Sequence, residues 1–173
     1  MSGEIWPVLY SEQRIAERIG TMAAEIASAK VRPQVAMPIL VGAFVFAADL
    51  VRALSRAGVA VEVEMLWLRS YGTRRTASAI SMIAGPPDDI AGKDVLVIDG
   101  VLDAGRTIKK AMQLCLAAGA ASVQVAVLLD KQRTDRVASA DFTGFTVGNE
   151  FVIGYGMDDA GKHRGLPYIG KAG

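Results

Sequence analysis

The segment from residue 94 to residue 118 restricts the fold of this chain more than any other segment does. Asp94 to Ile98 is a short run of branched apolar residues, typical of a strand that is buried on both faces of its sheet. Apolar residues at helical spacing from Ile108 to Ala118 predict a helix soon afterwards. A buried strand that leads into a helix is the unit from which parallel sheets are built. The segment therefore predicts an α/β fold.

The turn between this strand and this helix has the composition of an anion-binding site. Asp99 ends the apolar run, and the turn itself reads Asp103, Ala104, Gly105, Arg106, Thr107. Backbone N–H groups at a helix N-terminus are unpaired, and the helix dipole favours an anion beside them. The turn lacks the lysine of a GxxxxGK[ST] loop and the glycines of GxGxxG. The pattern leaves open an ordinary strand–turn–helix joint with Asp103 as a helix cap.

Further strands and helices are predicted in alternation along the rest of the chain. Helices are expected over 11–30 and 44–57, and strands over 34–41, 59–68, 122–129 and 151–153. In the 59–68 strand, Glu62 and Glu64 alternate with apolar residues that are expected to face the core. The segment 69–92 shows no clear period and is expected to be functional or partly mobile, with an edge hairpin in part of it. Such alternation predicts one parallel sheet, with ligands bound at the carboxyl ends of its strands.

Composition excludes several classes of protein. The 173 residues are 51% hydrophobic, which suits a single domain over 1–173, and the net charge of +1 argues against nucleic acid as a partner. The lone cysteine, Cys115, excludes a disulfide framework and is expected in the core. The longest apolar stretch, 35–50, is interrupted by Pro38 and Gly42 and is too short to span a bilayer. We therefore expect a soluble, cytoplasmic protein without a membrane partner.

Five motifs together resemble one known family over nearly the whole chain. They are LRSYG at residue 68, VLVIDGVLDAGRT at 95, LLDK at 128, NEFVIGYGMD at 149 and HRGLPYIG at 163. The chain resembles the type I phosphoribosyltransferases and, within them, the hypoxanthine-guanine phosphoribosyltransferases. The resemblance implies a central, mostly parallel twisted sheet flanked by helices, with a small hood built from terminal segments. Residues 149–173 are expected to contribute to a purine-binding part of that hood.

The resemblance also implies an activity. The family transfers the 5-phosphoribosyl group of 5-phosphoribosyl-1-pyrophosphate (PRPP) to N9 of hypoxanthine or guanine in purine salvage. The products are the nucleoside 5′-monophosphates IMP or GMP, and pyrophosphate. The implied cofactor is Mg²⁺, the implied partners are PRPP and a 6-oxopurine, and a homodimer or homotetramer is expected.

The resemblance carries roles onto particular residues. The implied catalytic residues are Asp103, with Ser70 and Tyr71 in a closing lid. Residues implied to bind PRPP and its phosphates are Asp99, Asp103, Ala104, Gly105, Arg106, Thr107, Val41, Gly42 and Arg164. Residues implied to bind the purine are Lys131, Phe151, Val152 and Asp158. Asp99 and Asp158 are the implied Mg²⁺ ligands.

Three positions depart from the pattern of the family. Gly100 stands where a second acid usually accompanies Asp99, Val41 stands where a lysine or arginine precedes the glycine of the pyrophosphate loop, and Ala104 replaces a hydroxyl residue. Losing a charged hydrogen-bond partner removes about 1.5–3 kcal/mol of binding. The family's pyrophosphate loop also has a cis peptide bond, which is expected here. Two functions therefore stay open: a salvage enzyme, and a weakly catalytic protein that binds a purine nucleotide or PRPP and regulates another process.

Overall fold

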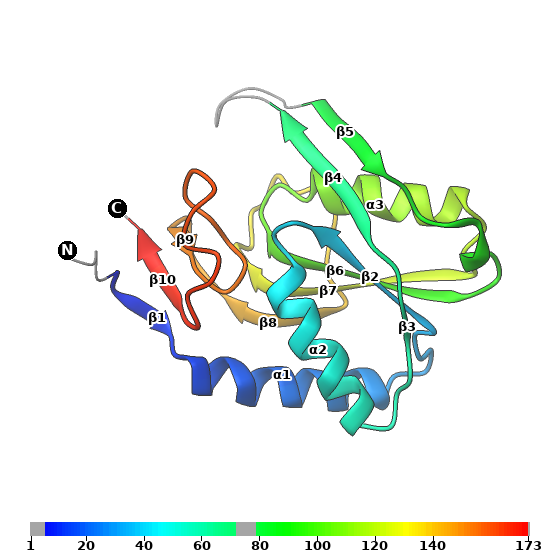
Figure 1. Cartoon of the computed structure of the whole chain (residues 1–173), viewed down its shortest axis with the longest axis horizontal. Helices are drawn as coiled ribbons and strands as arrows, with labels where there is room; N and C mark the ends of the chain where they lie inside the picture. Colours follow the sequence, from blue (N-terminus) through cyan, green and yellow to red (C-terminus); the bar gives the residue numbers. More distant parts are fainter. Residues whose placement is uncertain (1–5, 72–78, 173) are drawn as a thin grey trace.

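A seven-stranded sheet forms the centre of the molecule (Figure 1). The computed structural model describes residues 6–71 and 79–172, with the backbone alone at Ser70, Tyr71, Ala79 and Ala172. The strand order is β5 (Ala79–Ala84), β4 (Leu66–Tyr71), β2 (Val35–Leu40), β6 (Asp94–Leu102), β7 (Ser122–Asp130) and β8 (Phe142–Thr146), with the short β3 (Glu62–Val63) beside β2. Only the β4–β5 pair is antiparallel among these strands. The predicted α/β class with a mostly parallel sheet is confirmed.

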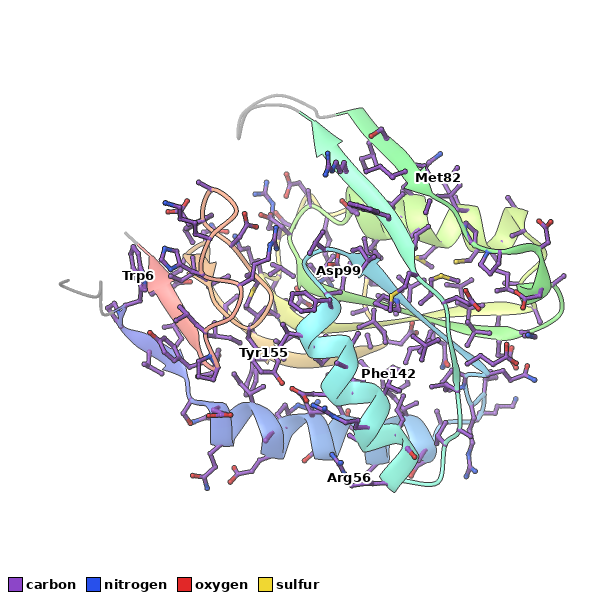
Figure 2. All side chains as sticks on the ribbon, viewed as in Figure 1. Trp6, Arg56, Met82, Asp99, Phe142 and Tyr155 are labelled. Carbon is purple, nitrogen blue, oxygen red and sulfur yellow. The ribbon has the colours of Figure 1, made fainter. Side chains whose placement is uncertain are left out.

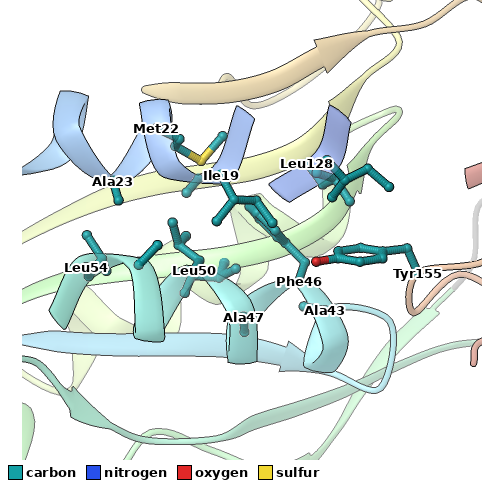
Figure 3. Close-up of a cluster of buried hydrophobic side chains, with 14 of the residues drawn as sticks. Ile19, Met22, Ala23, Ala43, Phe46, Ala47, Leu50, Leu54, Leu128 and Tyr155 are labelled. Atoms are coloured by element: carbon teal, nitrogen blue, oxygen red, sulfur yellow. The ribbon is translucent and has the colours of Figure 1, made fainter. Parts of the chain in front are cut away.

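Helices cover both faces of this sheet, and each face has its own apolar core. The helices α1 (Glu12–Ala27) and α2 (Phe44–Arg56) pack on one face, where Met22 of α1 and Leu50 of α2 share one apolar cluster (Figure 3). Leu96 and Ile98 of β6 belong to the same cluster. The helix α3 (Arg106–Ala117) packs on the other face against Val95 and Val97. Adjacent residues of β6 thus serve opposite cores, which explains why the strand is apolar throughout. Cys115 lies fully buried in the α3 core, as predicted, and burial raises the pKa of its thiol to about 11.

The central strand β6 is longer than its apolar run. The predicted strand ended at Ile98, but ladder pairing with β7 continues through Asp99 to Leu102. Asp99 therefore lies within the strand and does not terminate it. Hydrogen bonds to the neighbouring strand override the unfavourable strand propensity of aspartate. The helix α3 likewise begins at Arg106, two residues before the predicted start.

The predicted strand over 59–68 is wrong in detail. The chain forms β3 and β4 with a break at Glu64 and Met65, because both strands pair with β2 at different points along it. Val63 and Met65 are 43% and 49% exposed, so the expected apolar face is not buried. The edge hairpin expected within 69–92 is confirmed by the antiparallel pairing of β4 with β5. Figure 2 shows Met82 of β5 at the outer edge of the sheet, far from Asp99 at its centre.

A second, antiparallel sheet forms the hood. Its order is β1 (Val8–Tyr10), β10 (Ile169–Ala172) and β9 (Phe151–Ile153), so it joins the two ends of the described chain (Figure 1). The hood built from terminal segments is therefore confirmed. Of its strands only β9 was predicted, and β1 and β10, which are similarly short elements of three and four residues, were missed. In the described ranges, no helix combines the length and the apolar composition that crossing a membrane requires.

Candidate active site

A cavity of about 250 Å³ lies where the carboxyl ends of β6 and β7 meet the hood. It is lined by Gly42, Asp99, Gly100, Val101, Lys131, Phe151, Val152, Met157, Asp158 and Arg164. Seven of these were predicted as site residues: Gly42, Asp99, Lys131, Phe151, Val152, Asp158 and Arg164. Val101 and Met157 were missed, because apolar residues of a strand or a hood loop look like core residues in the sequence. The cavity thus gathers residues that are up to 122 positions apart, from Gly42 to Arg164.

The hood side of the cavity is held by an ion pair. The Arg164 guanidinium lies 2.7 Å from Oδ1 of Asp158, and it donates to the Gly156 carbonyl at 2.6 Å. The other oxygen of Asp158 accepts from the Gly161 N–H at 2.7 Å. These contacts fix the loop after β9 and place one carboxylate and one guanidinium on the cavity wall. Both side chains remain about one-third exposed, so a ligand can reach them.

On the sheet side of the cavity, the cation of Lys131 lies beside Asp103, the residue predicted to transfer a proton. Nζ of Lys131, which follows β7, lies 3.4 Å from Oδ2 of Asp103, which follows β6. Nη1 of Arg133 lies 3.3 Å from Oδ1 of Asp103, and Asp135 holds that guanidinium in turn. The Asp103 Oδ1 atom is buried and accepts no hydrogen bond of good geometry. Sequence reasoning missed Arg133, because the charged run from Lys131 to Arg136 has the composition of a solvated loop.

The turn from Asp103 to Thr107 is adjacent to this cavity rather than part of its lining. Gly105 caps α3 with a φ of +76°, in the left-handed region that favours glycine. A Cβ at this residue would lie 3.0 Å from the Ala138 nitrogen, so a larger residue would also crowd the neighbouring backbone. No acidic side chain lies in the first turn of α3, where one would repel an anion. The free N–H groups of Arg106 and Thr107 therefore suit a phosphate.

The loop after β2 lies at the other end of the cavity. The Leu40–Val41 peptide bond is cis, as the resemblance implied. The Gly42 carbonyl points into a space left by two glycines. A Cβ at Gly156 would lie 2.4 Å from this oxygen, and one at Gly100 would lie 3.3 Å from it. Val41 is 42% exposed and does not line the cavity. The residue at this position supplies no cation, but the Arg164 guanidinium lies beside the loop, with Nη1 3.9 Å from where a Cβ at Gly42 would lie.

Asp99 is the electrostatically unusual group of the cavity. Burial raises the pKa of its carboxyl to about 7, although the Gly100 N–H, which donates to Oδ1 at 2.7 Å, opposes the shift. The described part of the chain holds no cluster of three or more His, Cys, Asp or Glu able to bind a metal by itself. Mg²⁺ usually takes one or two carboxylates plus substrate phosphates, and Asp99 and Asp158 in one cavity fit that mode.

The two predicted lid residues lie at the end of β4. The backbones of Ser70 and Tyr71 belong to that strand, but their side chains lie outside the described residues. Their closing role therefore stays a prediction.

The raised pKa of Asp99 predicts a pH-dependent stability. Between about pH 4 and pH 7 the folded chain retains a proton at Asp99 that the unfolded chain has lost, so stability falls as the pH rises. Asp99→Asn cannot ionise, and its amide oxygen can still accept from Gly100. The variant should therefore gain stability over the native chain as pH rises from 4 to 8, at about 1.4 kcal/mol per unit of removed pKa shift. Urea unfolding at pH 4, 6 and 8 with a chelator present measures this. A difference that stays constant with pH would contradict the raised pKa.

Comparison with known proteins places this site in a family. The model of the phosphoribosyl transferase domain matches residues 6–160. The hypoxanthine phosphoribosyltransferase of Haemophilus influenzae is 36% identical over 95% of this chain and 93% of its own length. The bifunctional protein TilS/HprT of Listeria innocua is 37% identical over 98% of this chain. The chain spans 26% of that longer relative.

Solved structures agree with the sequence relatives. The hypoxanthine phosphoribosyltransferase of Trypanosoma cruzi in complex with the product IMP has a TM-score of 0.88 and 32% identity, over 100% of this chain and 97% of its own. A hypoxanthine phosphoribosyltransferase from Staphylococcus aureus has a TM-score of 0.86 and 28% identity, over 96% and 90%. Since the domain model covers most of the chain and a full-length relative exceeds one-third identity, this chain belongs to the phosphoribosyltransferase family, among the hypoxanthine phosphoribosyltransferases.

Proposed function

We propose that this chain transfers the 5-phosphoribosyl group of PRPP to N9 of hypoxanthine or guanine, releasing pyrophosphate, in purine salvage. The observation that carries the proposal is the single cavity that combines Lys131, Asp99 and the hood residues and borders the anion-binding turn at α3. A site for a purine nucleotide needs a polar side chain that hydrogen bonds to the base, an acceptor for the ribose hydroxyls and donors for the 5′-phosphate. The cavity and the adjoining turn offer one of each.

The purine is expected at the Lys131 end of the cavity. O6 and N7 lie on the same edge of a 6-oxopurine, so one ring can meet Lys131 and Asp103, whose charged atoms are 3.4 Å apart. Lys131 donates to O6, and Asp103 takes the N7 proton while N9 attacks. Phe151 stacks on the ring, and the backbone of Val152 contacts its edge. Both residues line the same cavity from β9 of the hood.

PRPP is expected to span the cavity from α3 to Arg164. Its 5′-phosphate lies against the N–H groups of residues 104–107, with the Thr107 hydroxyl as a further donor. Asp99 accepts from the ribose hydroxyls, and Arg164 contacts the pyrophosphate. Asp99 and Asp158 would hold Mg²⁺ together with substrate oxygens, and the ion would neutralise charge on the departing pyrophosphate.

The bond from C1 to pyrophosphate breaks as the bond from C1 to N9 forms, through a transition state with oxocarbenium character. Ser70 and Tyr71 close over C1 and exclude water in this proposal. The whole chain, 1–173, acts as one domain, with residues 149–173 in the purine hood. A homodimer or homotetramer in the cytoplasm completes the proposal, supported by the resemblance alone.

A second candidate function is a regulatory protein that binds PRPP or a purine nucleotide with little turnover. The observation that favours it is the missing charge at two positions of the PRPP half. Gly100 offers no carboxylate beside Asp99, and Val41 offers no cation beside Gly42. The purine half retains all of its predicted side chains in the cavity. Turnover therefore separates the two functions.

Turnover with different bases is the direct test. With saturating PRPP and Mg²⁺, hypoxanthine and guanine should be converted to their 5′-monophosphates, and adenine should be a poor substrate because Lys131 needs an acceptor at position 6. Ultraviolet absorbance follows the reaction, and a chelator should abolish it. A preference for adenine, or binding of IMP without turnover of any purine, would reject the enzyme.

Asp103→Asn tests the proton transfer at N7. The amide cannot take up the proton, so kcat should fall on the order of 10²-fold or more, while binding of IMP changes little. Asp135→Asn is the matched control, because it removes a carboxylate from the same charged cluster without contacting Asp103. It should leave kcat within about threefold of the native value. A near-native kcat in Asp103→Asn would make the residue structural.

Restoring the missing charges tests the PRPP half of the site. Gly100 does not adopt a positive φ, but a Cβ there would lie 3.3 Å from the Gly42 carbonyl, which must shift by a few tenths of an ångström. Gly100→Asp and Val41→Lys together should lower KM for PRPP by about tenfold, the effect of one charged hydrogen bond, and leave the purine KM unaltered. Each single variant should lower KM for PRPP by a smaller factor, since it restores only one of the two missing charges.

Thermal unfolding must accompany these kinetics, because the shift at Gly42 can lower stability. If the double variant is stably folded and PRPP use does not improve, the site is not a weakened copy of the family site. The regulatory function, or a different phosphorylated ligand, would then be the better account.

A further inference from the structure

A buried carboxylate lies directly beside the cavity without belonging to it. Asp130 is the last residue of β7 and precedes Lys131. It is 6% exposed, and no other charged residue in the described ranges is as deeply buried. A buried carboxylate is stable only when cations and donors surround it. The groups that surround Asp130 therefore show what it holds in place.

The first group is the turn that carries Lys131. Oδ1 of Asp130 accepts from the Gln132 N–H at 2.7 Å, and Gln132 has a φ of +48°. The N–H of Lys131 itself donates to the Leu102 carbonyl at 3.0 Å. The carboxylate thus closes a turn in an uncommon backbone conformation immediately after Lys131. The direction in which the lysine leaves the sheet depends on this turn.

The second group is Arg136, which lies at the far side of the same loop. Its Nη1 atom donates to both oxygens of Asp130, at 2.9 and 3.1 Å. The next residue, Val137, donates its N–H to the Ala104 carbonyl at 3.0 Å. The nitrogen of Ala138 lies so close to Gly105 that a Cβ there would be 3.0 Å from it. Arg136 therefore holds the segment that packs behind the turn expected to bind phosphate.

We propose that Asp130 and Arg136 are positioning residues that couple the purine end of the site to its 5′-phosphate end. The pair ties the turn that directs Lys131 to the segment that supports Ala104 and Gly105. Neither side chain lines the cavity. The inference rests on the proposed function for the identity of the two ends, and it concerns two residues outside the lining of the cavity.

The test compares Arg136→Gln, Asp130→Asn and the double variant with the native chain. Calorimetry measures Kd for IMP and for inosine, and kinetics measure kcat and KM for hypoxanthine. Arg136→Gln should weaken IMP binding about tenfold or more, weaken inosine less, and raise KM for hypoxanthine, because both ends lose their support. In the double variant the two introduced amides can hydrogen bond to each other, and no unpaired carboxylate remains. The affinity for IMP should therefore return to at least about one-third of the native value.

Arg18→Gln provides the matched control. Arg18 also pairs with a carboxylate, Glu25 at 2.8 Å, and donates to two backbone carbonyls, but it lies on α1 outside the cavity. It should lower Tm and leave both Kd values unchanged. A purely structural role for Asp130 and Arg136 predicts the same result for their variants, which would overturn the proposal. If Arg136→Gln does not fold, Arg136→Lys, which retains one donor and the charge, replaces it with a smaller expected loss.

Binding and turnover by the native chain distinguish a failure of this proposal from a failure of the proposed function. Native binding of IMP without turnover would reject the enzyme and leave the coupling testable through Kd. If the native chain binds neither IMP nor inosine, both the coupling and the proposed function are overturned.

Discussion

The register between two parallel strands determines where the chemistry lies. Leu102 of β6 pairs with Asp130 of β7 at the carboxyl ends of both strands, so the next residues along each strand, Asp103 and Lys131, emerge side by side. The N–H of Lys131 donates to the Leu102 carbonyl and extends this alignment one residue beyond the ladder. Shifting the register by one residue would turn the side chains of either strand to the opposite core. Burial of both faces of β6 fixes the register, and the register therefore keeps Asp103, the predicted proton acceptor, close to Lys131, which is predicted to bind the purine.

Charged groups around the cavity follow one rule, with one exception. Asp158 is paired with Arg164, Asp130 with Arg136, and Asp103 with Lys131, so ion pairs hold the hood loop and the loops after β6 and β7. Asp99 forms no ion pair within the described part of the chain, and burial raises its pKa to about 7. A carboxylate whose ionised form is disfavoured in the free protein is expected at a position where a ligand supplies the compensating charge or donors. Gly100 adds no second carboxylate beside Asp99, where the resemblance implies one.

The three segments that meet at Gly42 explain how the divergent positions can coexist with an intact fold. The Gly42 carbonyl faces Gly100 from one side and Gly156 from the other, so the pyrophosphate loop, the central strand and the hood are in contact through backbone. Such contacts do not depend on the charge of the neighbouring side chains. The loop can therefore lose the cation at position 41 and the acid at position 100 together, and the cavity retains its shape. We therefore expect Val41 and Gly100 to affect substrate binding and not folding.

The sequence by itself determined the α/β class, the βα unit at residues 94–118 and the cysteine in the core, because burial on both faces leaves a periodic apolar pattern. The resemblance added the hood and seven of the residues that line the cavity. Tertiary structure decided what lacks a local signal. Asp99 belongs to β6 only because β7 pairs beside it, and the strand expected over 59–68 is split because β2 pairs with both halves. Arg133, Asp130 and Arg136 look like a solvated run of charges, and only the folded loop shows that Asp130 and Arg136 form an ion pair between the turn after Lys131 and the segment behind Gly105. The spacing of apolar residues shows which face of a helix or strand is buried, because burial repeats along the element. Contacts between loops that are distant in the sequence produce no such repeat, so the sequence does not reveal them.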